Sequence, residues 1–314
     1  MELLKAARIA VQKCMGVRAS ETVLIVTDQP RLKIARALAG AAEEIAAKTV
    51  LVVMQKRTRH GEEPPKIVEQ AMCAADVVLA PTTYSLTHTQ ARLRACRAGA
   101  RVATMPMITE SMMQRGAMLA DYKKVGALTT KVTERLNQAS LVEIETRAGT
   151  KLRLDVSGRK AHPDTGIYLN PGDFGNLPAG EAFVAPVEGS GEGVVVVDGS
   201  MGDVLRAPVD ITVRRGRAAK IVGKPARKLR RMLDAVGSKG YNLAEFGIGT
   251  NYAARLIGNV LEDEKVLGTC HIALGDNSTF GGRVKAGIHL DGIILRPTIK
   301  FDGKIVMREG KLRL

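Results

Sequence analysis

Two of the chain's five histidines, His271 and His289, lie in the single stretch GTCHIALGDNSTFGGRVKAGIHLDGIIL. His289 begins a His-Leu-Asp tripeptide with apolar neighbours. Because residues two apart in a β-strand face the same side, His289 and Asp291 would project together, as metal ligands or as a hydrogen-bonded polar pair. His271 lies in a second strand-like segment, CHIAL, where a buried histidine needs a partner. Neighbouring strands could bring both imidazoles to one metal ion; two unrelated core histidines are the alternative.

Two acidic residues lie in similarly apolar surroundings. Glu181 stands in NLPAGEAFVAP and Glu245 in LAEFGIGTN. A buried carboxylate without a partner costs several kcal/mol, so each needs a cation nearby. One of the 47 lysines and arginines is the simple explanation for either one. With Asp291 and the two histidines, however, the segments offer three carboxylates and two imidazoles.

The ordered set NLPAGEAFVAP, LAEFGIGTN, CHIALG and IHLDGII resembles the aminopeptidase T and S group of thermophilic metalloaminopeptidases. The resemblance covers the second half by motif and the first half by architecture. It implies a homodimeric hydrolase that removes N-terminal residues from peptides with a water activated by two divalent ions, zinc, cobalt or manganese. Glu245 would bridge the metals and act as the general base. The positions that match the family's metal ligands are Glu181, Glu245, His271, His289 and Asp291.

Two departures keep other functions open. The chain is shorter than those aminopeptidases, and the loop after His271 reads DNSTF, without the tyrosine that they have there. His271, His289 and Asp291 also form the two-histidine, one-carboxylate set of a mononuclear iron(II) oxygenase. A dihydroxypyridine dioxygenase resembles the same family, although the scarcity of aromatic residues gives little sign of a pocket for an aromatic substrate. A non-catalytic relic with a structural metal is the third possibility. Retention of Glu181 and Glu245 favours the two-metal aminopeptidase.

The first half of the chain alternates strand-like and helix-like segments. The expected strands are 21–28, 49–55, 76–82 and 101–106, and the expected helices are 30–48, 64–75, 88–100 and 109–138. This alternation predicts a Rossmann-like α/β domain with a mostly parallel sheet over residues 1–138. No glycine-rich phosphate loop follows the first strand, so nucleotide binding is not expected.

The pattern changes near residue 140. Residues 141–158 read as a β-hairpin, and further strand-like runs separated by glycine-containing turns follow it. Helical periodicity returns only at 225–237 and 251–264. Residues 139–314 are therefore expected to form an antiparallel-rich α+β domain that carries the catalytic metal site.

Composition excludes several other functions. The net charge is +15, but the basic residues are scattered and no aromatic residues interleave with them, so no specific nucleic-acid partner is expected. The four cysteines have no metal-ligand spacing. No apolar run approaches the roughly 18 residues that a membrane span needs. We expect a cytoplasmic enzyme that acts on a peptide or another small molecule.

Overall fold

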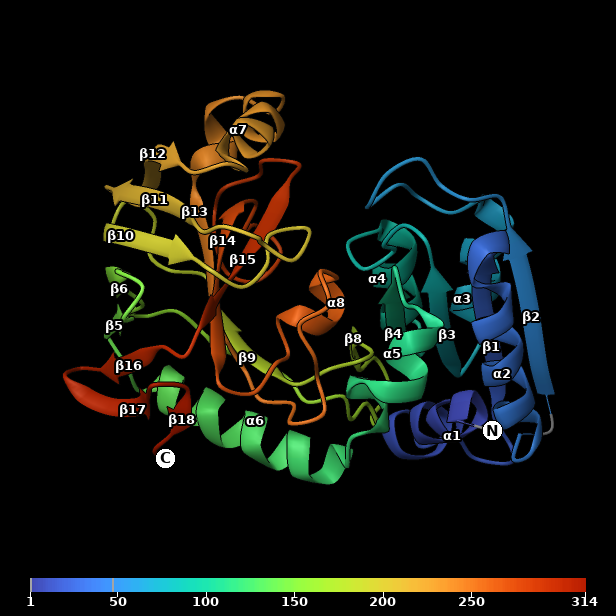
Figure 1. Cartoon of the computed structure of the whole chain (residues 1–314). Coiled ribbons are helices and arrows are strands. Elements are labelled where there is room, and N and C mark those ends of the chain that lie inside the picture. Colours follow the sequence, from blue (N-terminus) through green and yellow to red (C-terminus); the bar gives the residue numbers. More distant parts are fainter. Residues whose placement is uncertain (1, 47) are drawn as a thin grey trace. The chain divides into compact units, whose positions relative to one another are not determined.

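A computed structural model of the protein describes residues 2–46 and 48–314. The chain divides into two compact units, each shown in Figure 1. The first comprises the chain up to Gly126 together with Thr165–Ala179, and the second comprises Ala127–Asp164 and Gly180–Leu314. The predicted domain boundary at 138/139 falls at the end of helix α6, whereas this division falls inside that helix. That boundary stays a prediction about which segments fold together.

The elements of the first unit alternate, and those of the second are mostly strands. The helices are α1 (Glu2–Arg8), α2 (Leu32–Glu43), α3 (Lys66–Ala74), α4 (Gln90–Arg97), α5 (Glu110–Arg115), α6 (Tyr122–Asn137), α7 (Ala226–Asp234) and α8 (Val260–Asp263). The strands are β1 (Thr22–Asp28), β2 (Lys48–Met54), β3 (Val77–Thr82), β4 (Arg101–Pro106), β5 (Leu141–Glu145), β6 (Lys151–Asp155), β7 (His162–Asp164), β8 (Phe174–Asn176), β9 (Glu181–Val184), β10 (Glu192–Val197), β11 (Val209–Arg214), β12 (Arg217–Val222), β13 (Leu243–Gly249), β14 (Thr269–Gly275), β15 (His289–Leu295), β16 (Thr298–Phe301), β17 (Lys304–Arg308) and β18 (Lys311–Leu312).

A parallel sheet forms the centre of the first unit, with the strand order β2-β1-β3-β4-β8. Every residue of β3 and β4 is buried, as expected for a parallel sheet that is covered on both faces. Helices α3 and α4 pack on the face that carries Leu24, Val26 and Val78. The predicted α/β fold with a mostly parallel sheet is confirmed.

Two of the expected helices are shorter than their periodicity suggests. The stretch 109–138 is interrupted after Arg115, and α6 begins only after Asp121, whose carboxylate accepts hydrogen bonds from the backbone of Lys123 and Lys124. The predicted helix 251–264 is wrong over most of its length, because Gly258 adopts a positive φ of 80°. Only α8 is helical there, with the Asn259 side chain capping its first turn.

Antiparallel strands build the second unit, as predicted. One sheet has the order β12-β11-β10-β6-β5-β16-β17-β18 and the other has the order β15-β14-β13-β9-β7. The predicted hairpin is formed by β5 and β6. Side chains from both sheets and from α7 share one apolar core, including Val195, Ile211, Leu229, Phe246 and Ile272.

The β15-β14-β13-β9-β7 sheet has one apolar face and one polar face. Ala182, Phe246, Ile272 and Ile294 point into the core, as members of the same apolar cluster. The residues between them on each strand must face the other side, because side chains alternate along a strand. Every histidine and carboxylate singled out from the sequence is on this second face, which is called the site face below.

Across residues 2–46 and 48–314, no helix combines the length and the apolar character that crossing a membrane requires.

Candidate metal centre

The strand register brings the predicted ligands together on the site face. His271 on β14 lies opposite Gly247 on β13, and Asp291 on β15 lies opposite Ala273 on β14. Glycine and alanine at these central positions leave room for larger side chains from the neighbouring strands. The expectation that His271 and His289 lie on adjacent strands is correct, since β14 and β15 pair directly.

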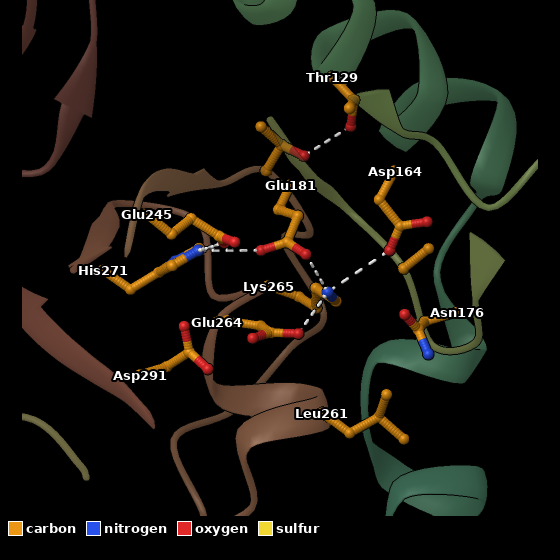
Figure 2. Close-up of polar contacts among 12 residues, drawn as sticks. Thr129, Asp164, Asn176, Glu181, Glu245, Leu261, Glu264, Lys265, His271 and Asp291 are labelled. Carbon is orange, nitrogen blue, oxygen red and sulfur yellow. Dashed lines mark hydrogen bonds and ion pairs between the residues drawn. The ribbon is translucent and has the colours of Figure 1, made fainter. Parts of the chain in front are cut away.

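His271 is completely buried between two carboxylates from different strands. Its Nε2 atom lies 3.1 Å from Oε2 of Glu181 on β9 and 3.2 Å from Oε1 of Glu245 on β13. Figure 2 shows both contacts. Burial alone would lower the pKa of His271, but the two carboxylates outweigh it and raise the pKa well above the usual value. The two carboxylates therefore favour a positive charge at this position, which a proton or a metal ion can supply.

His289 stands at the accessible side of the group, with 31% of its side chain exposed. Its Nε2 atom lies 3.3 Å from Asp291 Oδ1 and 3.5 Å from Glu245 Oε2. The other ring nitrogen, Nδ1, lies 2.8 Å from the carbonyl oxygen of Asp276 and must donate a proton to it. In the neutral imidazole this contact leaves the lone pair on Nε2, the arrangement that metal-binding histidines use. Although burial opposes the charged form, Asp291 and Glu245 raise the pKa of His289 to about 10, so a metal ion at Nε2 would replace a proton.

The donor atoms of this site fit a first-row metal ion. Ligands about 2.1 Å from such an ion lie roughly 3.0–3.4 Å from one another, close to the contacts that join His271, Glu245, His289 and Asp291. Asp291 Oδ1 is buried and approaches His289 without hydrogen-bond geometry. Within the described residues, the carboxylates and histidines form two groups whose donor atoms all lie within 4.8 Å of each other. These are Glu245 with His289 and Asp291, and Glu181 with Glu264 and His271.

A buried lysine that sequence reasoning missed lies within the second group. Lys265 is completely buried, with Nζ 2.5 Å from Glu181, 2.6 Å from Glu264 and 3.4 Å from Asp164. Figure 2 shows the ammonium between these three carboxylates. Although burial opposes its charge, the carboxylates raise the pKa of Lys265 well above its usual value. Burial raises the pKa of Glu181, but Lys265 and His271 reverse this effect and keep it below the ordinary value.

Aromatic rings line the site face beside the candidate ligands. His162 stacks on Phe183 at 5.4 Å between ring centroids, and Phe183 meets Phe280 edge-on at 5.5 Å. Phe280 in turn meets His289 edge-on at 5.8 Å. Two of the chain's five phenylalanines thus lie beside the candidate ligands on the site face. The low aromatic content did not reveal this cluster, because segments far apart in the sequence bring the rings together.

The loop that follows β14 is held by two carboxylates. Glu188 accepts hydrogen bonds from the Arg283 backbone at 2.7 Å and from the Asn277 amide at 3.1 Å, and it forms an ion pair with Arg159. Asp276 accepts from the backbone of Ala286 at 2.7 Å. Glu188 therefore anchors the loop that carries Phe280, and it does not contact the candidate ligands. The contacts of Glu188 therefore support a structural role in holding this loop.

The comparisons with known proteins decide between the functions left open by the sequence. A family model described as NicX, 2,5-dihydroxypyridine 5,6-dioxygenase, matches residues 2–314. The chain belongs to this family. The 2,5-dihydroxypyridine 5,6-dioxygenase of Pseudomonas putida KT2440 is 24% identical over 260 residues, which are 77% of this chain and 72% of that protein.

Two solved structures show the same fold. The structure of 2,5-dihydroxypyridine dioxygenase from Pseudomonas putida KT2440 superposes with a TM-score of 0.84 at 21% identity, over 99% of this chain and 96% of that one. Wild-type AmpT from Thermus thermophilus superposes with a TM-score of 0.75 at 18% identity, over 100% of this chain and 99% of that one. The aminopeptidase-like fold expected from the sequence motifs is confirmed by the second structure.

The predicted activity is wrong. Membership of the NicX family along the whole chain contradicts a metalloaminopeptidase, a protease or any other hydrolase, and it supports the dioxygenase alternative. A dioxygenase family implies iron(II), so the pair of zinc, cobalt or manganese ions is not supported. The motifs misled because the chain shares its fold with both solved structures, and a shared fold does not fix the reaction. The homodimer and the lack of a nucleic-acid partner stay predictions.

Proposed function

We propose that this protein is a mononuclear non-haem iron(II) dioxygenase that opens the ring of 2,5-dihydroxypyridine or a closely related dihydroxylated pyridine. The observation that carries the proposal is that two histidines and one aspartate lie on one face of the paired strands β14 and β15, in a chain that belongs to the NicX family. His271, His289 and Asp291 would hold the iron, in the two-histidine, one-carboxylate set typical of such oxygenases. Bound iron(II) supplies the redox chemistry that lets dioxygen react with a closed-shell aromatic ring.

Glu245 is placed to handle a proton. Its two carboxylate oxygens contact the two histidines separately, Oε1 at His271 and Oε2 at His289. Burial raises the pKa of Glu245, and the nearby charge of Asp291 adds to the effect. A carboxylate of raised pKa is a better proton acceptor, so Glu245 would take a proton from a substrate hydroxyl and hold it at its carboxyl oxygen. This role replaces the water activation expected for a peptidase.

Phe183 and Phe280 would position the ring. Both side chains are half-buried. Phe280 meets His289, whose imidazole is partly open to solvent, and Phe183 packs against Phe280. Their ring contacts provide an apolar surface on which a flat heteroaromatic substrate can pack, and they exclude water from the reacting carbons. Neither role requires a residue from outside the second unit.

The reaction is balanced by one molecule of dioxygen. Both oxygen atoms add across the C5–C6 bond of 2,5-dihydroxypyridine, and that bond breaks. The hydroxyl-bearing C5 becomes a carboxyl carbon, and C6 becomes a formyl carbon that remains attached to the ring nitrogen. The substrate loses its aromatic absorbance as a result, which provides a direct assay.

The test is anaerobic reconstitution of metal-free protein with iron(II), followed by addition of 2,5-dihydroxypyridine and oxygen. We expect equal consumption of dioxygen and substrate, and mass spectrometry should show both oxygen atoms in the product. His289→Ala and Asp291→Ala should lose bound iron and activity together. Iron-loaded protein that consumes no oxygen with any dihydroxypyridine would overturn the proposal, as would full activity in His289→Ala.

A further inference from the structure

The ammonium group of Lys265 lies among carboxylates that could otherwise bind a metal ion. Among the described residues, it contacts three carboxylates, at 2.5 Å for Glu181, 2.6 Å for Glu264 and 3.4 Å for Asp164. Two of them, Glu181 and Glu264, also belong to one of the two donor groups that are compact enough to surround a metal ion. The ammonium therefore lies at the carboxylates that a metal ion in that group would use.

The backbone fixes Lys265 at this place. The carbonyl oxygen of Lys265 accepts a hydrogen bond from Asn251 at 2.8 Å, directly after α8. The adjacent Val266 carbonyl oxygen rests against Gly249, where a Cβ atom would come within 2.1 Å of it. Gly249 in turn lies opposite Glu181 in the sheet. The backbone of the lysine is thus held from two sides, and its side chain is completely buried with the ammonium among these carboxylates.

We propose that the Lys265 ammonium is a built-in cation that replaces a second metal ion. This chain then binds one metal ion, and it gains a second divalent-cation site when Lys265 is replaced by an uncharged residue. The proposal rests on the proposed function only for the place of the first metal, at His271, His289 and Asp291. It concerns the neighbouring group formed by Glu181, Glu264 and Asp164.

The charges around Lys265 support this assignment. Buried carboxylates need a compensating cation, and an ammonium within 2.6 Å of two of them supplies it without an external ion. A divalent ion at the same carboxylates would meet a fixed positive charge at close range and low dielectric, which strongly disfavours its binding. Replacing the lysine with an uncharged side chain removes the repulsion and leaves carboxylate oxygens, the ligands that manganese(II) prefers.

Lys265 also sets how Glu181 meets the first site. Oε1 of Glu181 contacts Lys265, and Oε2 lies 3.1 Å from His271 Nε2. The lysine therefore keeps one oxygen of this carboxylate occupied, and Glu181 contacts the candidate iron ligand with the other alone. Without Lys265, Oε1 of Glu181 also becomes free to bind metal.

The experiment is manganese(II) titration of metal-free wild type, Lys265→Met and Lys300→Met, with calorimetry and elemental analysis after desalting. Lys300 is the matched control, because it contacts the single carboxylate of Glu145, at 3.6 Å, in the other sheet of this unit. We expect one manganese per chain in wild type and Lys300→Met and two in Lys265→Met. The electron paramagnetic resonance spectrum of the loaded Lys265→Met variant should show an exchange-coupled pair.

Two manganese ions in wild type, or only one in folded Lys265→Met, would overturn the proposal. If Lys265→Met does not fold without metal, it should refold when manganese(II) is present, since binding stabilises the folded state. Lys265→Gln, which keeps one donor for Glu181, is the second variant, and a folded Gln variant with one manganese also contradicts the assignment. Wild type that binds one metal but opens no ring would refute the proposed function alone.

Discussion

Gly247 on β13 lies directly opposite His271 on β14, and no side chain fits between them. A Cβ atom at residue 247 would lie 2.1 Å from His271 Nε2 and 2.3 Å from its Cε1 atom. The imidazole therefore crosses β13 above this glycine to reach Glu181 on β9. The candidate centre depends on a missing side chain as much as on the ligands themselves.

Gly247→Ala should weaken iron binding while the fold is retained. The added methyl group must displace the His271 ring from its position, and we expect a loss of at least about tenfold in iron(II) affinity, roughly 1.4 kcal/mol. Anaerobic titration with iron(II) measures it, with circular dichroism as the check on folding. Gly40→Ala in α2 is the control, because a Cβ atom there meets nothing within 4 Å. Equal iron affinity in both variants would contradict this account of His271.

The shared face of the candidate ligands was predictable because it follows from strand alternation. His289 and Asp291 are two residues apart in β15, and both lie on the face opposite to Ile294, which points into the apolar core. Glu181 and Glu245 could also be singled out, since each interrupts an apolar run that the structure shows to be a buried strand. Periodicity thus identifies which residues share a face, provided that the segment is a strand.

Lys265 could not be predicted in the same way. It follows the segment 251–264, whose periodicity suggests an amphipathic helix with exposed charges, and most of this segment is irregular. Its partners Asp164 and Glu181 come from strands β7 and β9, and Glu181 lies 84 residues earlier in the chain. Only the tertiary fold brings these residues to Lys265. The motifs also did not predict the activity, because one fold can carry different reactions.

Phe280→Ala should affect substrate binding more than iron binding. Phe280 contacts His289 only through an edge-on ring contact, and the imidazole keeps its hydrogen bond to Asp276. Aromatic contacts contribute roughly 0.5–1.5 kcal/mol, so we expect KM for 2,5-dihydroxypyridine to rise about 2- to 10-fold. Steady-state oxygen consumption gives KM and elemental analysis gives the iron content. Phe280→Tyr, which keeps the ring, should stay near wild type; an unchanged KM in Phe280→Ala would rule out a positioning role.

Glu188→Gln should loosen the loop between β14 and β15. The substitution removes the charge that Arg159 meets and weakens the hydrogen bonds from Asn277 and Arg283. We expect faster amide hydrogen exchange across residues 276–288 and a several-fold lower kcat, because this loop carries Phe280 and orients His289. Glu192→Gln is the matched control, since Glu192 accepts a hydrogen bond from Arg215 in a different turn. If exchange in the loop is the same in both variants, Glu188 does not hold it.

The Glu21–Arg101 pair should make the first unit sensitive to acid. Arg101 is almost completely buried, and two of its nitrogens donate to the two carboxylate oxygens of Glu21 at 2.8 Å. These hydrogen bonds hold the pKa of Glu21 below its ordinary value, despite an opposing effect of burial. The stabilisation is therefore complete above the unfolded-state pKa of about 4.3 and is lost as the pH falls through the lower folded-state value.

Glu21→Gln should consequently lower the free energy of unfolding by about 1–3 kcal/mol at pH 7, since it leaves a buried guanidinium with a weaker partner. The difference from wild type should shrink below pH 4, where wild-type Glu21 also becomes neutral. Urea unfolding followed by circular dichroism at pH 7 and at about pH 3.5 measures both values. Glu44→Gln, which breaks the exposed pair with Arg8, should change stability much less at either pH. A difference between wild type and Glu21→Gln that is constant with pH would show that the ion pair is not the cause.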